Sequence, residues 1–221
     1  MNKIQRRIQI LRFIGEQGAV TVEQISRRFG NKESAVRTLF GKLNLEQVRV
    51  GAIRYGLWRV GNQDILDEVN SYYPDRLPLL VRAFVLPELL HSLRVTDIRI
   101  LLEKSKEIKV TNWVSESALR SMPAQIREIP YAKIPDAIFE VEFGKGIRRF
   151  YLEYERTFKN LAKYKRIFDY YDCRNDIGAK QIIYVTEDCK VKNRLSQLPK
   201  MDPKYVLYSW DELKDKYQKR R

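Results

Sequence analysis

Two apolar segments separated by a glycine-containing turn lie between residues 134 and 155. Both are rich in Ile, Phe, Val and Tyr, and the turn Gly144-Lys145-Gly146 between them is typical of a β-hairpin. Asp136 opens the first expected strand, and Glu153 and Glu155 share one face at the end of the second, because side chains alternate across a strand. Three converging carboxylates repel one another unless a positive charge lies between them. The segment therefore predicts a hairpin with a candidate site for a divalent metal ion.

The charge of the chain indicates an anionic partner. The 221 residues include 42 Lys and Arg against 28 Asp and Glu, which gives a net charge of +14. Nucleic acid is the plain partner for such a charge, and an anionic membrane is the competing one. No segment approaches the ~20 apolar residues of a spanning helix, and the amphipathic N-terminus does not resemble a signal peptide. Cys173 and Cys189 form no CxxC pair, which argues against a zinc site or a disulfide framework and favours the cytoplasm.

Residues 1–61 have the pattern of a winged helix-turn-helix domain. Three short helical segments precede two strand-like runs, 47–50 and 55–60, which are joined through Gly51. The third helix of such a domain enters the major groove, and the wing contacts phosphates. The polar and basic residues expected on these two elements are the candidate DNA-binding residues: Lys32, Ser34, Arg37, Thr38, Lys42, Arg49, Arg54 and Arg59. The alternative is a winged helix that contacts only proteins.

The rest of the chain predicts a connector and a second domain. Residues 62–90 are punctuated by Pro74, Pro78 and Pro87 and are expected to connect the domains, with a short helix or strand. Residues 91–221 alternate helical and strand-like segments around the hairpin, which predicts a mixed α/β layered domain. The helix after the hairpin carries Lys165 at the flank of its apolar stripe, so this lysine could lean over the sheet.

The acidic residues resemble the PD-(D/E)xK nuclease superfamily. Pro135-Asp136 matches the first half of its motif and Glu153-Tyr154-Glu155 the second. The resemblance implies a restriction-endonuclease-like fold and metal-assisted hydrolysis with Mg²⁺ or Mn²⁺, in which the ion polarises the phosphate and activates water. Glu155 stands where the superfamily has lysine. Either Glu155 is a further metal ligand or an outer-shell base and Lys165 supplies the charge, or the site is degenerate.

Additional residues resemble the plasmid replication-relaxation family, which includes the MobC-type mobilisation relaxases. The resemblance extends from the winged helix to about Tyr171, and the acidic–x–acidic–Arg signature of the family is matched by residues 153–156. It implies a protein that nicks or relaxes double-stranded DNA at an origin of transfer or replication of a mobile element. Other mobilisation or replication proteins are the implied partners. The residues that match the family around the acidic motif are candidate accessory residues: His91, Asp97 and Arg156.

The chain has a single histidine, which excludes relaxases that combine a histidine cluster with a tyrosine nucleophile. A tyrosine nucleophile without such a cluster stays open. Nucleotide-driven activity is unsupported, because neither a P-loop nor a Rossmann glycine fingerprint is found. Three classes of function remain: a metal-dependent nicking enzyme, a non-catalytic DNA-binding regulator or relaxosome accessory protein, and a cytoplasmic scaffold. A homodimer is left open as well.

Overall fold

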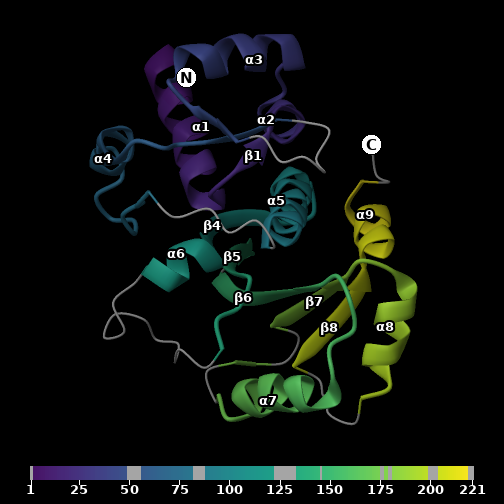
Figure 1. Ribbon diagram of the computed structural model, residues 1–221. Coiled ribbons are helices and arrows are strands. Elements are labelled where there is room, and N and C mark those ends of the chain that lie inside the picture. Colours follow the sequence, from purple (N-terminus) through teal and green to yellow (C-terminus); the bar gives the residue numbers. More distant parts are fainter. Residues whose placement is uncertain are drawn as a thin grey trace. The chain divides into compact units, whose positions relative to one another are not determined.

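The computed structural model describes residues 2–48, 56–81, 88–121, 133–144, 146–174, 177–178, 181–198 and 204–218. The chain divides into two compact units, residues 1–100 and 101–221 (Figure 1). The elements include helices and a five-stranded mixed sheet, so the fold belongs to the mixed α+β class. The division differs from the expected boundaries at residues 61 and 91, because the N-terminal unit continues through the expected connector.

The N-terminal unit contains three helices and three short strands, followed by α4 and the first part of α5. In chain order the elements are α1 (Lys3–Gln17), β1 (Val20–Thr21), α2 (Val22–Phe29), α3 (Glu33–Lys42), β2 (Glu46–Val48), β3 (Leu57–Arg59), α4 (Gln63–Ser71) and α5 (Leu89–Lys104). The strands form an antiparallel sheet in the order β1–β3–β2. Thr21 begins α2 through a capping box with Gln24, and Gly30 ends it in the left-handed conformation. The three predicted helices are confirmed.

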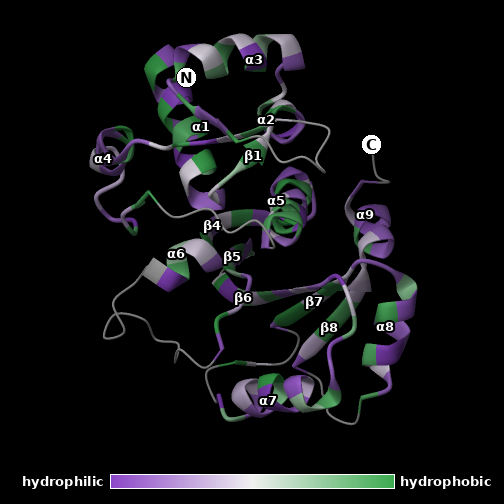
Figure 2. Cartoon of the chain, viewed as in Figure 1, coloured by the Kyte–Doolittle hydropathy of each residue, from purple (hydrophilic) through white to green (hydrophobic). Residues whose placement is uncertain are grey.

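The core of the N-terminal unit explains why α4 belongs to it. Apolar side chains of α1 and α3, such as Ile14 and Phe40, are fully buried in one cluster. Figure 2 shows hydrophobic segments, coloured green, on both helices. Leu66 and Val69 of α4 are buried in the same cluster. Burying a Leu or Val side chain contributes roughly 1.5–3 kcal/mol, so residues 62–71 are part of this fold and not a link outside it.

The C-terminal unit is built on a five-stranded mixed sheet. Its elements after α5 are β4 (Lys109–Ser115), α6 (Glu116–Ser121), β5 (Ala137–Phe143), β6 (Gly146–Glu155), α7 (Leu161–Asp172), β7 (Ile182–Thr186), α8 (Cys189–Ser196), β8 (Tyr205–Ser209) and α9 (Trp210–Gln218). The strand order is β4–β5–β6–β7–β8; the first three strands are antiparallel, and β7 and β8 run parallel to β6. The predicted alternation of helices and strands is confirmed.

The predicted hairpin is confirmed as β5 and β6. Phe143 pairs with Gly146, and Gly144 adopts a φ of +49°, a backbone conformation that glycine takes at low cost. The apolar sides of α7 and α8 pack against one face of the sheet in a cluster that includes Tyr164 and Tyr184. Helix α9 contacts β7 and β8, and Lys216 of α9 donates to the Tyr208 hydroxyl on the other face.

Candidate active site

Asp136 is fixed by hydrogen bonds just before the start of β5, directly after Pro135. Its N–H donates to the Leu152 carbonyl at 3.0 Å, and its carbonyl accepts from the Glu116 N–H at 2.9 Å. The carboxylate accepts the Tyr154 N–H at 2.6 Å. The Asp136 side chain therefore pairs with the backbone of β6 just before β5 begins. This hydrogen bond holds the carboxylate beside residues 153–155.

Glu153 and Glu155 lie on one face of β6, as the alternation predicts. Both are buried, at 1% and 2% exposure. Glu153 accepts from the Tyr171 hydroxyl of α7, and Glu155 forms an ion pair with Lys159 at 2.5 Å. Helix α7 and the segment before it therefore cover the face of the sheet that carries the two glutamates.

Lys133 supplies a positive charge that the sequence reading did not find. Its Nζ lies 2.6 Å from Oε2 of Glu153, and only 16% of the side chain is exposed. Burial by itself would lower the pKa of Lys133, but the charges of Glu153 and Asp136 outweigh burial and raise the pKa. Lys133 stands three residues before Asp136 in an irregular segment, where no periodicity could have indicated the direction of its side chain.

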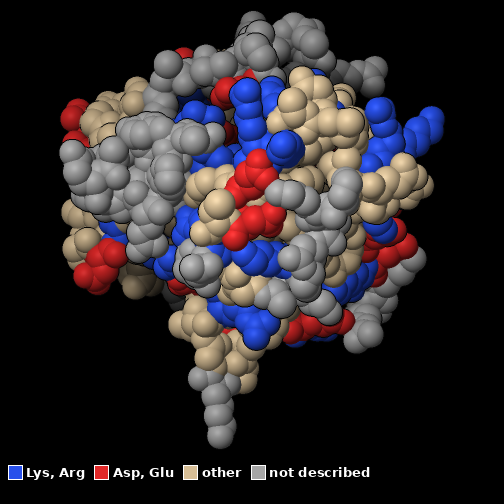
Figure 3. Space-filling model, turned by 90° about the horizontal axis from the view of Figure 1, so that it is seen from below, with Lys and Arg blue, Asp and Glu red and all other residues tan. Residues whose placement is uncertain are grey.

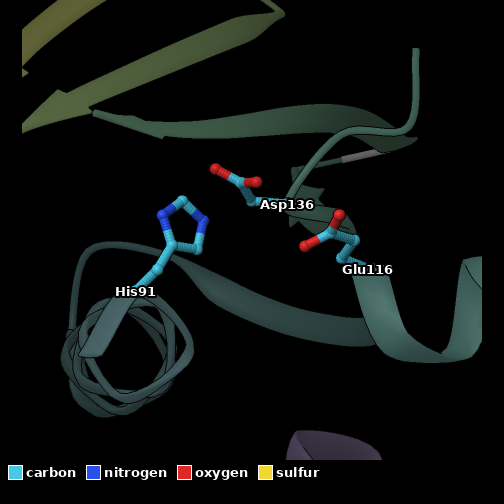
Figure 4. Close-up of side chains that lie close together, drawn as sticks. All are labelled: His91, Glu116 and Asp136. Carbon is cyan, nitrogen blue, oxygen red and sulfur yellow. The ribbon is translucent and has the colours of Figure 1, made fainter. Parts of the chain in front are cut away.

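A further acidic residue lies beside Asp136. Glu116, the first residue of α6, has a carboxylate oxygen within 4.8 Å of one of Asp136 (Figure 4). It also forms an ion pair with Arg120 at 2.5 Å. The sequence alone assigns Glu116 no role, because only the pairing of β4 with β5 brings residue 116 next to residue 136.

Burial raises the pKa values of both glutamates. For Glu153 burial is the largest cause and brings the pKa to about 7; the Asp136 charge adds to it, and Lys133 and the Tyr171 hydroxyl oppose it. Burial also raises the pKa of Glu155, against the opposing charge of Lys159. A carboxylate that holds a proton near neutral pH is a feature of functional sites as well as of buried ion-pair networks.

The donor set suits a hard divalent cation. Asp136, Glu153 and Glu155 offer carboxylate oxygens, which Mg²⁺ and Mn²⁺ prefer to nitrogen or sulfur. The Tyr184 side chain is fully buried, lies opposite Glu153 in the register of β6 and β7, and has no hydrogen-bond partner among the described residues. Asp136, Glu153 and Glu155 therefore offer the oxygen donors that the implied ion takes, beside a buried hydroxyl that is left for a solvent molecule to satisfy.

The remaining site predictions fall into three groups. Lys165, the expected source of the missing charge, lies in the exposed part of α7, and the ion pairs of the two glutamates are made by other lysines. Arg156 is exposed just after β6. His91, also labelled in Figure 4, is carried by α5 in the N-terminal unit, where Asp97 forms an ion pair with Arg27 of α2. The accessory roles of these residues stay predictions.

The expected DNA-contacting residues of α3 are exposed. The set comprises Lys32, at the N-cap position of the helix, and Ser34, Arg37, Thr38 and Lys42 on its outward side. Arg37 forms a long, exposed ion pair with Glu33 at 3.5 Å. Arg59 of β3 is half-buried and paired with Glu46 at 2.7 Å. Arg49 and Arg54 lie outside the described residues.

Comparisons of the chain with family models, with curated proteins and with solved structures gave no match. Across the part of the chain that the structure describes, no helix combines the length and the apolar character needed to cross a membrane.

Proposed function

We propose that this chain is a DNA-binding, metal-dependent endonuclease that nicks duplex DNA, as the resemblance to the plasmid replication-relaxation family implies. The observation that carries the proposal is the placement of Asp136 where β5 begins and of buried Glu153 and Glu155 on one face where β6 ends, with the Asp136 carboxylate accepting the N–H of Tyr154, the residue between the two glutamates. Two lysines, Lys133 and Lys159, pair with the glutamates. Three carboxylates against two lysines leave a net negative charge that a divalent cation would balance.

The topology supports the PD-(D/E)xK assignment. Asp136 precedes β5, the two glutamates end the adjacent strand β6, and α7 follows in the chain and covers the same face. Three helices followed by paired strands likewise support the winged-helix assignment of the N-terminal unit. On this assignment the exposed residues of α3 contact the major groove.

The chemistry follows from the residues that would surround the phosphate. A bound Mg²⁺ or Mn²⁺ supplies Lewis acidity toward the phosphate and lowers the pKa of its bound water. Asp136, Glu153 and Glu155 would hold the ion, and the Tyr154 N–H orients Asp136 for this task. Lys133 provides the positive charge that the superfamily places at the position of Glu155, and it stabilises the negative charge that develops on the phosphate. The free, exposed thiols of Cys173 and Cys189 suit a reducing cytoplasm.

Nicking of supercoiled plasmid in Mg²⁺ or Mn²⁺ tests the proposal. Asp136→Asn keeps an acceptor for the Tyr154 N–H but removes a charge, and we expect it to reduce the nicking rate by at least about a hundredfold. Duplex binding measured in EDTA should stay within twofold. Glu142→Gln, which neutralises an exposed acid of β5, is the matched control and should nick normally. Equal nicking by the wild type and Asp136→Asn would remove the assigned site.

One observation favours a non-catalytic alternative. Lys133 and Lys159 already pair with Glu153 and Glu155, so the buried acids are partly neutralised from within the chain. A DNA-binding regulator or relaxosome accessory protein with a degenerate nuclease fold would keep such pairs for stability alone. On this alternative, the wild-type protein binds duplex DNA but does not cleave it in the presence of any metal ion. On the enzyme proposal, the wild-type protein nicks DNA when metal is present, and Asp136→Asn abolishes the nicking.

A further inference from the structure

Helix α7 carries three basic residues within a single turn on its outward side. Lys163, Lys165 and Arg166 are all exposed, and none forms an ion pair with an acidic side chain in the part of the chain that the structure describes. Other basic residues of the same unit are paired: Lys109 with Glu142 at 2.7 Å, and Lys214 with Asp211 at 2.6 Å. The α7 cations thus keep their full charge available to an outside anion.

The opposite side of α7 fixes these cations relative to the acidic residues. Tyr164, Ile167, Phe168 and Tyr171 are buried against the sheet, and the Tyr171 hydroxyl donates to Glu153. Asn160 caps the helix by accepting from the Lys163 N–H at 2.9 Å. A helix held by four buried aromatic and aliphatic side chains presents its outward cations in a defined position.

The chemistry of this surface favours a phosphate backbone over a lipid surface. A helix that lies in a membrane inserts a broad apolar face, but the apolar face of α7 is already buried in the protein. Leu161, at the start of the helix, is 63% exposed, and no apolar stripe adjoins it on the outward side. Half-buried Asp169 is the acidic residue nearest in sequence, so the turn 163–166 itself contains no acidic side chain. Figure 3 views the molecule from the side on which α7 lies in Figure 1, and Lys and Arg are spread over this face among Asp and Glu.

We propose that Lys163, Lys165 and Arg166 bind backbone phosphates of duplex DNA, which gives the C-terminal unit a DNA-contact surface of its own. The inference rests on the proposed function, because it takes duplex DNA as the substrate. Lys165 then contacts the backbone and takes no part in the chemistry at Glu153. Long side chains at positions i and i+3 of a helix are neighbours, so Lys163 and Arg166 can follow one strand while Lys165 extends from the flank.

The test uses the full chain and a fluorescent 30-base-pair duplex of random sequence in EDTA, with anisotropy measured over a KCl series. The variant is Lys163→Gln/Lys165→Gln/Arg166→Gln, which keeps good helix-forming residues at exposed positions. Its control is Lys106→Gln/Arg148→Gln/Lys190→Gln, which removes the same charge from exposed positions elsewhere in the unit. Each lost phosphate contact lowers the slope of log K against log salt by about 0.9. We expect the α7 variant to lower the slope by roughly two to three and the control by less than about one.

Each outcome decides the inference. Equal slopes for the wild type and the α7 variant, or equal losses in the variant and the control, overturn it, because the effect would then be absent or only one of net charge. The wild type and the α7 variant are also tested for binding to vesicles containing phosphatidylserine. If the wild type binds these vesicles and the variant does not, while their binding to the duplex is equal, the surface belongs to a membrane instead. The proposed function is judged separately by plasmid nicking, so a wild type that binds DNA through α7 but never nicks supports the surface and contradicts the enzyme. A wild type that binds no duplex contradicts both.

Discussion

Glu153→Gln removes a carboxylate whose pKa burial raises to about 7, from an ordinary value of 4.5. The substitution keeps the size of the side chain and an oxygen that can accept from the Tyr171 hydroxyl. We expect it to change how the stability of the C-terminal unit depends on pH, in the absence of metal.

The magnitude follows from linkage between proton binding and folding. Because the pKa of Glu153 is higher in the folded state, the folded state binds more protons between pH 4.5 and 7. The stability contributed by protonated Glu153 is fully present below pH 4.5 and is lost as the pH rises through 7. One pKa unit corresponds to 1.36 kcal/mol, so this group alone should lower the free energy of unfolding by roughly 2–3 kcal/mol between pH 5 and pH 8.

Urea unfolding in EDTA at four pH values between 5 and 8 measures the effect. Trp113 is buried in β4 and reports on the C-terminal unit, so the assay uses a background in which Trp58 and Trp210 are replaced by phenylalanine. The free energy of unfolding of Glu153→Gln minus that of the Trp113-only parent should become more positive as the pH rises. Glu142→Gln, which removes a carboxylate at an exposed position of the same sheet, is measured alongside as the matched control.

A pH-independent difference for Glu153→Gln would refute the assigned burial and charge of this group. A difference that becomes more negative with rising pH would show instead that ionised Glu153 stabilises the fold through Lys133. In that case the Lys133 pair, and not burial, would control the site.

Four further perturbations test other parts of the argument. Tyr171→Phe removes a hydrogen-bond donor to Glu153 and should lower the free energy of unfolding in urea by about 1 kcal/mol. It should also move the pH dependence of stability to higher pH, and an unchanged pH profile would contradict the hydrogen bond. Thr21→Ala removes the capping box of α2 and should cost about 1 kcal/mol in the N-terminal unit, followed through Trp58, whereas exposed Thr38→Ala should cost much less. Adding 10 mM Mg²⁺ at pH 8 should raise the urea midpoint of the wild type but not that of Asp136→Asn, since a ligand stabilises only the state that binds it. Arg37→Ala should weaken duplex binding and lower the salt slope by about one; an unchanged slope would exclude a phosphate contact at this residue.

The elements of this fold were predictable where local chemistry decides them. The glycine turn and the alternating strands predict the β5–β6 hairpin, and they place Glu153 and Glu155 on one face. Asn160 and the apolar stripe after it predict α7. These signals lie within a few residues of the structure they specify, which is why the sequence alone was sufficient.

The partners of the acidic residues depend on tertiary contacts and were not predictable. Lys133 reaches Glu153 from an irregular segment 20 residues earlier in the chain, and Glu116 meets Asp136 only because β4 pairs with β5. Lys165 was expected to supply the positive charge near the glutamates because it lies on the helix after the hairpin. Helical spacing predicts only where a side chain lies relative to the buried stripe of its own helix, and not which acidic residue it reaches. The role of α4 was likewise hidden, because prolines suggested a connector while two buried side chains, Leu66 and Val69, join it to the N-terminal core.

The hydrogen bond from the Tyr154 N–H to the Asp136 carboxylate also constrains how a lineage of such proteins can change. Position 136 does two things at once, because the side chain that would hold a cation also satisfies a buried backbone donor of β6. If the proposed cleavage is lost in a descendant, Glu153 could be replaced by an uncharged residue without loss of the fold. At position 136 it would have to keep a hydrogen-bond acceptor of similar length, so that among inactive relatives aspartate or asparagine should persist there long after the other acids have drifted.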